Sequence, residues 1–71
     1  MDLPQILGRN VRAARLRRGQ SQEQLAFEAQ MKRSYVSDLE RGARNPSLKA
    51  IERLALALEM PAADLLKSPQ A

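Results

Sequence analysis

The chain has 71 residues, with 12 Lys+Arg against 8 Asp+Glu and therefore a formal net charge of +4. It contains neither Cys nor His, which excludes disulfides, thiol nucleophiles, the usual imidazole base and ordinary zinc sites. No apolar run approaches the roughly 20 residues of a membrane helix, and the N-terminus has no secretory segment. The composition predicts one soluble, cytoplasmic domain that needs no cofactor and contacts no membrane.

The net charge is confined to one part of the chain. Residues 1–44 hold nine Lys/Arg and five Asp/Glu, whereas residues 45–71 hold three of each sign. This asymmetry favours a polyanionic partner for the first part, such as a nucleic acid, and a different use for the second.

The apolar residues recur at helical spacing, and nothing alternates with the period of a strand. A first helix is predicted over about 4–18, ended by Gly19 in the left-handed conformation. Ser21 begins a second helix, because Gln24 stands where a capping box requires it. The inward side chains of these two helices are predicted to be Ile6, Leu7, Val11, Ala14, Leu25, Ala26 and Ala29.

A turn at 30–32 leads to a third helix, predicted over about 33–41, with Val36 and Leu39 inward. A fourth helix follows over about 48–59, with Ser47 as its N-cap. Pro61 opens a short fifth helix over about 61–67. The apolar stripe of the fourth helix is predicted to be Leu48, Ile51, Leu54, Ala55 and Leu58.

Several short runs together resemble the Cro and phage-repressor (XRE-type) helix-turn-helix family, over about residues 6–66. They are Arg15, Gly19, Ser-Gln-Glu-Gln-Leu-Ala at 21–26, Arg-Ser-Tyr-Val-Ser at 33–37, Leu-Glu-Arg-Gly at 39–42 and Asn-Pro-Ser-Leu at 45–48. The resemblance implies an all-α bundle of five helices in which the second and third form the helix-turn-helix. Within the family, the length and the Arg-Ser-Tyr-Val run are most similar to the controller proteins of restriction–modification systems.

Two positions depart from the family's pattern. Gln30 replaces the usual glycine, and a positive φ there would strain the backbone by roughly 1–2 kcal/mol. Gln20 replaces the usual apolar residue, so the hydrophobic staple before the second helix is expected to be absent.

The resemblance implies a sequence-specific transcription regulator that binds a palindromic operator in double-stranded DNA as a homodimer. RNA polymerase is a candidate further partner. The alternative is an antitoxin-like protein whose main role is to neutralise another protein. An enzyme is not expected, because the chain has no His, no Cys, no clustered carboxylates and no Gly-rich phosphate loop. We expect residues 1–67 to form the domain, with a dimerising last helix, and residues 68–71 to fray.

On a helical wheel of 100° per residue, the polar side of the third helix lies opposite its inward side. Arg33, at its exposed start, can bond guanine O6 and N7 together and is the leading base contact. The predicted DNA-binding residues are Gln22, Arg33, Ser34, Tyr35, Ser37, Asp38, Arg41, Arg44 and Asn45. Four alternatives stay open. Arg33 and the polar side of the third helix are only a solvated helix surface, Gln22 only caps its helix, Tyr35 only packs on the second helix, and Arg44 is only a solvated loop charge.

The resemblance also implies a structural ion pair between Arg15 and Glu40, the alternative being two unrelated surface charges. The candidate dimer contacts are apolar residues of the C-terminal third, namely Leu56, Met60, Leu65 and Leu66. The alternative is that the fifth helix folds back and buries Leu65 or Leu66 in the monomer core.

Overall fold

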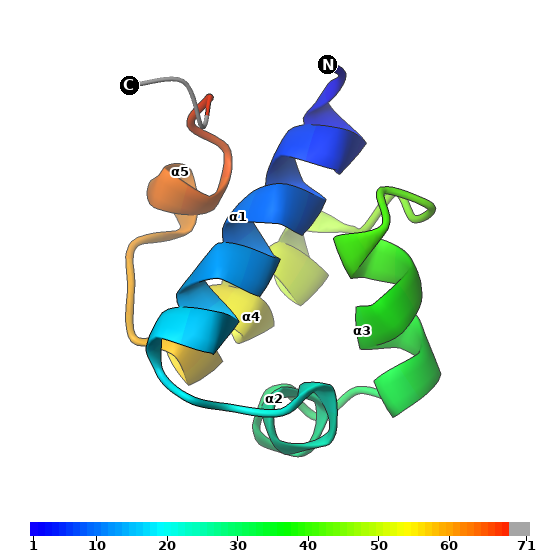
Figure 1. Ribbon diagram of the computed structural model, residues 1–71. Helices are drawn as coiled ribbons and strands as arrows, with labels where there is room; N and C mark the ends of the chain where they lie inside the picture. The colour runs from blue at the N-terminus through cyan, green and yellow to red at the C-terminus, as the bar shows by residue number, and fades with distance from the viewer. Residues whose placement is uncertain (69–71) are drawn as a thin grey trace.

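The computed structural model describes residues 1–68. These residues form five helices joined by turns and loops, and no strand occurs among them (Figure 1). They are α1 (Leu3–Arg17), α2 (Gln22–Ala29), α3 (Arg33–Glu40), α4 (Leu48–Leu58) and α5 (Ala62–Leu65). The predicted all-α fold is confirmed. α5 is shorter than predicted at both ends, because Pro61 is its N-cap and Leu66 is its C-cap. Apart from Ser68, the predicted frayed tail lies outside the described residues.

Side-chain caps fix where the helices begin. Asp2 and Ser21 each accept a hydrogen bond of 3.0 Å from the backbone N–H three residues later. Gln5 and Gln24 complete the two capping boxes, because their side-chain oxygens accept from the N–H of Asp2 and Ser21. The box at Ser21 was predicted, whereas the box at Asp2 was not and starts α1 one residue early. Ser47 caps α4 as predicted.

All five helices contribute to one core. Its buried side chains are Leu7, Val11, Ala14, Leu25, Ala26, Ala29, Val36, Leu39, Ile51, Leu54, Ala55, Leu58 and Leu65. Two predicted inward residues differ: Ile6 is only partly buried, and Leu48 is 81% exposed. Leu48 is the first residue of α4, one turn before Ile51, and it borders open hollows at the edge of the core instead of filling it.

The prediction that Leu65 contacts a second copy is wrong. α5 folds back onto α1 and α4 (Figure 1). Leu65 is therefore fully buried in the monomer core. The Nδ2 of Asn10 secures that position by donating to the carbonyls of Leu65 and Lys67, at 2.8 and 2.7 Å. The neighbouring Leu66 is 36% exposed. The folding-back alternative is therefore correct for Leu65.

Gly8 marks the closest approach of α1 to α3. A Cβ at this position would lie 2.4 Å from the carbonyl oxygen of Leu39 and 2.8 Å from that of Glu40. Both are backbone atoms, which cannot move aside without shifting the end of α3. The glycine therefore allows α1 to lie directly against the C-terminal end of α3.

The turn between α2 and α3 contains a strained residue. Gln30 has φ 60° and ψ 47°, in the left-handed region that favours glycine. The next N–H, of Met31, donates to the carbonyl of Ala26 at 2.8 Å and closes the end of α2. The turn therefore keeps the left-handed conformation that glycine adopts without strain, although the residue at this position is Gln30.

Replacement of Gln30 by glycine should stabilise the protein by about 0.5–1 kcal/mol, because the relief of strain exceeds the added entropy of the unfolded chain. Thermal unfolding followed by circular dichroism should show a Tm higher by about 2–8 °C. The control is Ala13→Gly at an exposed position within α1, which should lose about 1 kcal/mol. A Gln30→Gly protein that melts below the wild type would contradict this account of the turn.

Candidate nucleic-acid interface

α3 has one buried side and one exposed polar side. Val36 and Leu39 are 0% and 1% exposed. On the helical wheel, Ser34, Ser37 and Arg41 lie opposite them. The structure therefore keeps the predicted polar face of α3 outside the core.

Arg33 stands at the first position of α3. It is exposed, and its side chain forms no hydrogen bond or ion pair with any other residue among 1–68. Its guanidinium therefore keeps all five N–H donors available for an external acceptor.

Asp38 is already paired in the middle of the polar face. One carboxylate oxygen accepts from Arg41, and the other accepts from the Nη2 of Arg44 at 3.3 Å. Arg41 also donates from Nη1 to the Oγ of Ser37 at 3.2 Å. These pairs are exposed, and each is worth less than about 1 kcal/mol, so an incoming phosphate can displace them. Asp38 orients two predicted DNA-binding arginines in the free protein.

Tyr35 supports Arg44 from the other side. The Tyr35 ring packs against the core, and the guanidinium carbon of Arg44 lies 5.0 Å from the ring centroid. At this distance the cation is attracted to the ring face. Arg44 is thus held between a ring and a carboxylate, whereas Asn45, next in the loop, is exposed.

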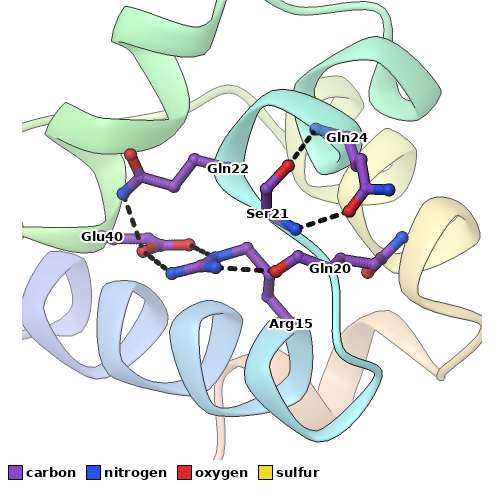
Figure 2. Close-up of polar contacts among 6 residues, drawn as sticks. All are labelled: Arg15, Gln20, Ser21, Gln22, Gln24 and Glu40. Carbon is purple, nitrogen blue, oxygen red and sulfur yellow. Dashed lines mark hydrogen bonds and ion pairs between the residues drawn. The ribbon is translucent and has the colours of Figure 1, made fainter.

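The predicted ion pair between Arg15 and Glu40 is present and is buried beneath this surface (Figure 2). The Nε of Arg15 lies 2.7 Å from Oε2 of Glu40, and its Nη2 lies 3.1 Å from Oε1. The two side chains are only 9% and 3% exposed. The remaining nitrogen, Nη1, donates to the carbonyl of Gln20 at 2.8 Å. One guanidinium therefore connects α1, the segment before α2 and the last residue of α3.

Glu40 also fixes the side chain of Gln22. Its Oε1 accepts from the Nε2 of Gln22 at 3.1 Å, and Figure 2 shows the amide oxygen of Gln22 pointing away from Glu40. Because one N–H is used internally, Gln22 presents one acceptor and one donor outward. That pair matches the N6 and N7 edge of adenine. The side chain that caps α2 is that of Ser21, so the capping alternative for Gln22 fails.

A polar hollow of about 270 Å³ lies between α1, α2 and α3. It is lined by Arg12, Arg15, Gln22, Ser37, Glu40 and Arg41. Arg12 is exposed and forms no ion pair within residues 1–68, so the hollow gives α1 a cation beside the predicted interface.

A second hollow lies on the other side of α3 and brings together residues that the sequence did not single out. It places Lys32 and Arg53 beside Arg44. Arg53 belongs to α4, within the segment that carries no net charge. Its positive charge is therefore cancelled when charges are summed along the sequence. The one sequence signal was the absence of an acidic residue four positions away on α4.

Within residues 1–68 no cluster of three or more His, Cys, Asp or Glu side chains could hold a metal ion. No helix in this part of the chain has the length and apolar character required to cross a bilayer.

The sequence comparison shows the family. Residues 6–67 match the family model described as a helix-turn-helix domain. The chain therefore belongs to the helix-turn-helix family of the Cro and phage-repressor (XRE) type, as predicted. Control protein C.BamHI from Bacillus amyloliquefaciens is 48% identical over 62 residues, which cover 86% of this chain and 76% of that protein.

The structural comparison agrees. The hypothetical transcription factor NHTF from Neisseria has a TM-score of 0.93 at 43% identity, over 97% of this chain and 79% of its own. The restriction–modification controller protein C.Esp1396I, solved as a tetramer with its natural 35 base-pair operator, has a TM-score of 0.81 at 28% identity. That match covers 94% of this chain and 99% of that one. The relatives are thus transcription regulators, and they include controller proteins.

The buried pair can be tested by a double-mutant cycle. Arg15→Met should lose about 3–5 kcal/mol of unfolding free energy, because it leaves a buried carboxylate without its cation. The double variant with Glu40→Gln should lose clearly less than the sum of the two single variants. Urea unfolding followed by circular dichroism measures all four proteins. Small and additive losses would mean that the two side chains are not coupled.

Proposed function

We propose that the protein is a cytoplasmic transcription regulator that binds double-stranded DNA with α3 in the major groove. The observation that carries the proposal is the exposed polar face of α3, which begins with the unpaired Arg33 and is braced from behind by a buried ion pair. A helix fits the major groove, about 12 Å wide, and in a helix-turn-helix the first helix crosses behind the recognition helix. α2 and α1 both pack on α3.

The residues divide into base contacts and phosphate contacts. Arg33 is assigned to a guanine and Gln22 to an adenine, because their free donors and acceptors match those base edges. Ser34, Ser37 and Asp38 reach base edges at shorter range. Phosphate contacts are assigned to Arg41, Arg44, Asn45 and the hydroxyl of Tyr35.

The relatives favour this function over the antitoxin alternative. The reported relatives are named as a control protein, a transcription factor and a controller protein, rather than as enzymes or antitoxins. The controller protein C.Esp1396I was solved as a tetramer on an operator, which supports DNA binding by an oligomer here. A contact with RNA polymerase stays a prediction.

We further propose a homodimer, because one recognition helix contacts too few base pairs to select a single site in a genome. Leu48 and Leu66 border two adjoining hollows of about 470 and 200 Å³ between α4, α5 and the start of α1, and this apolar surface suits a second copy. Leu56, which is 73% exposed two turns further along α4, and the partly buried Met60 are the other candidate contacts. Two copies would place their α3 helices about 34 Å apart, on a palindrome.

Arg33 should determine sequence preference, whereas Arg44 should contribute affinity for any DNA sequence. After selection of a preferred duplex, Arg33→Ala should lose about 1–3 kcal/mol on that duplex and less on a scrambled one. Arg44→Ala should weaken both duplexes equally. Fluorescence anisotropy across a salt series measures both effects, since each neutralised phosphate adds about −0.9 to the log–log slope. A flat salt response would exclude DNA as the ligand, and unchanged discrimination in Arg33→Ala would exclude Arg33 as a base contact.

The dimer should depend on Leu66 more than on Leu56. Leu66→Asp places a charge on the apolar surface beside α5 and should shift the protein to a monomer without loss of helix content. Leu56→Asp is the matched comparison, whereas Leu65→Asp should unfold the core. Sedimentation at micromolar concentration measures the association state. If only Leu56→Asp dissociates the dimer, the interface lies on the Leu56 side of α4. A wild type that is monomeric at this concentration would contradict the proposed dimer.

A further inference from the structure

The hollow on the Tyr35 side of α3 has the composition of an anion site. It has a volume of about 260 Å³ and is lined by Met31, Lys32, Ser34, Tyr35, Arg44, Ala50 and Arg53. Three of these seven side chains are cations, and none is acidic. Since one water occupies about 30 Å³ in the liquid, the hollow holds several waters or one hydrated phosphate.

Two of its three cations have no partner. Lys32 and Arg53 are exposed, and their side chains form no hydrogen bond or ion pair with any residue among 1–68. Only Arg44 is paired, with a carboxylate that also serves Arg41. The hollow therefore carries positive charge that the protein itself leaves uncompensated.

The N-terminus of α3 adds to this charge. Lys32 is the N-cap of this eight-residue helix, and no side chain accepts from its first N–H groups. The free N–H groups of a helix start carry a partial positive charge and favour an anion. Lys32 and Ser34 both line the hollow, so the uncapped helix end lies at its edge.

The position relative to α3 indicates which anion binds. On the helical wheel Tyr35 lies on one flank of the polar face and Glu40 on the other. The hollow with Arg12 and Arg41 lies on the Glu40 flank. A helix in the major groove has a phosphate strand on each side, so cations are needed on both flanks.

We propose that the hollow binds one phosphodiester of the DNA backbone, with Arg53 and Lys32 as ligands in addition to Arg44. The proposal rests on the proposed function, and it adds α4 to the elements that contact DNA. It also divides the contacts between the two strands, with α1 and the end of α3 on one strand, and α4 and the start of α3 on the other.

The test compares Arg53→Ala with Arg17→Ala, which removes an arginine at the end of α1 that is also exposed and unpaired but lines neither hollow. Arg53→Ala should weaken the selected and the scrambled duplex alike, by roughly tenfold. It should also reduce the magnitude of the salt slope by about 0.9. Arg53→Lys should retain most of the slope, and thermal melts should be unchanged in all three variants.

A methylphosphonate scan of the selected duplex then locates the contact. Neutralising one phosphate per half-site should weaken the wild type but leave Arg53→Ala without further loss. A wild type that binds neither duplex would overturn the proposed function and this inference together. DNA binding in which Arg53→Ala behaves as Arg17→Ala would overturn this inference alone. Stabilisation by inorganic phosphate that needs Arg53, with an unchanged salt slope, would also overturn it, since the hollow would then bind a free anion.

Discussion

The arrangement of the first three helices depends on the buried ion pair between Arg15 and Glu40. Two buried charges lose their hydration, and a pair is tolerated only where further hydrogen bonds satisfy the remaining donors and acceptors. Here the carbonyl of Gln20 and the amide of Gln22 supply those bonds. Because the partners come from α1, the α1–α2 turn, α2 and α3, the pair is satisfied only when all of these segments are in place (Figure 2). Gly8 is required for the same reason, since any Cβ would push α3 away from α1.

The same network prepares the surface above it. Gln22 is oriented by Glu40 before any ligand arrives, so less side-chain entropy is lost on binding. Arg44 is likewise held by Tyr35 and Asp38. By contrast, the side chain of Arg33 has no partner within residues 1–68, so it would be ordered only by the base proposed as its contact. The interface therefore combines fixed polar groups with one adaptable arginine.

Features with local causes could be predicted from the sequence, and features decided by packing could not. Ser21 with Gln24, and Gly19, act within one helical turn, so the end of α1 and the start of α2 followed from the residues nearby. Leu65 and Leu66 are adjacent and equally apolar, and only the fold of α5 onto α1 decides which one is buried. The unpaired charge of Arg53 could not be recognised from charges summed along the chain. The electrostatic surface depends instead on which cations have partners in space.

The cations on the two flanks of α3 also explain why a second copy of the chain is needed for sequence-specific binding. In the proposed complex the cations on both flanks position α3 on the phosphates, but phosphate contacts carry no sequence information. Between the flanks Ser34 and Ser37 are short, and Arg41 is assigned to a phosphate. The side chains assigned to two bonds with one base are therefore Arg33 and Gln22. Each bidentate contact discriminates by about 1–3 kcal/mol, so two of them supply about 2–6 kcal/mol and reach only the lower part of the roughly 4–10 kcal/mol that separates specific from non-specific binding. Two copies related by a two-fold axis would supply about 4–12 kcal/mol and span that range without any new residue type, which is a physical reason for a palindromic operator.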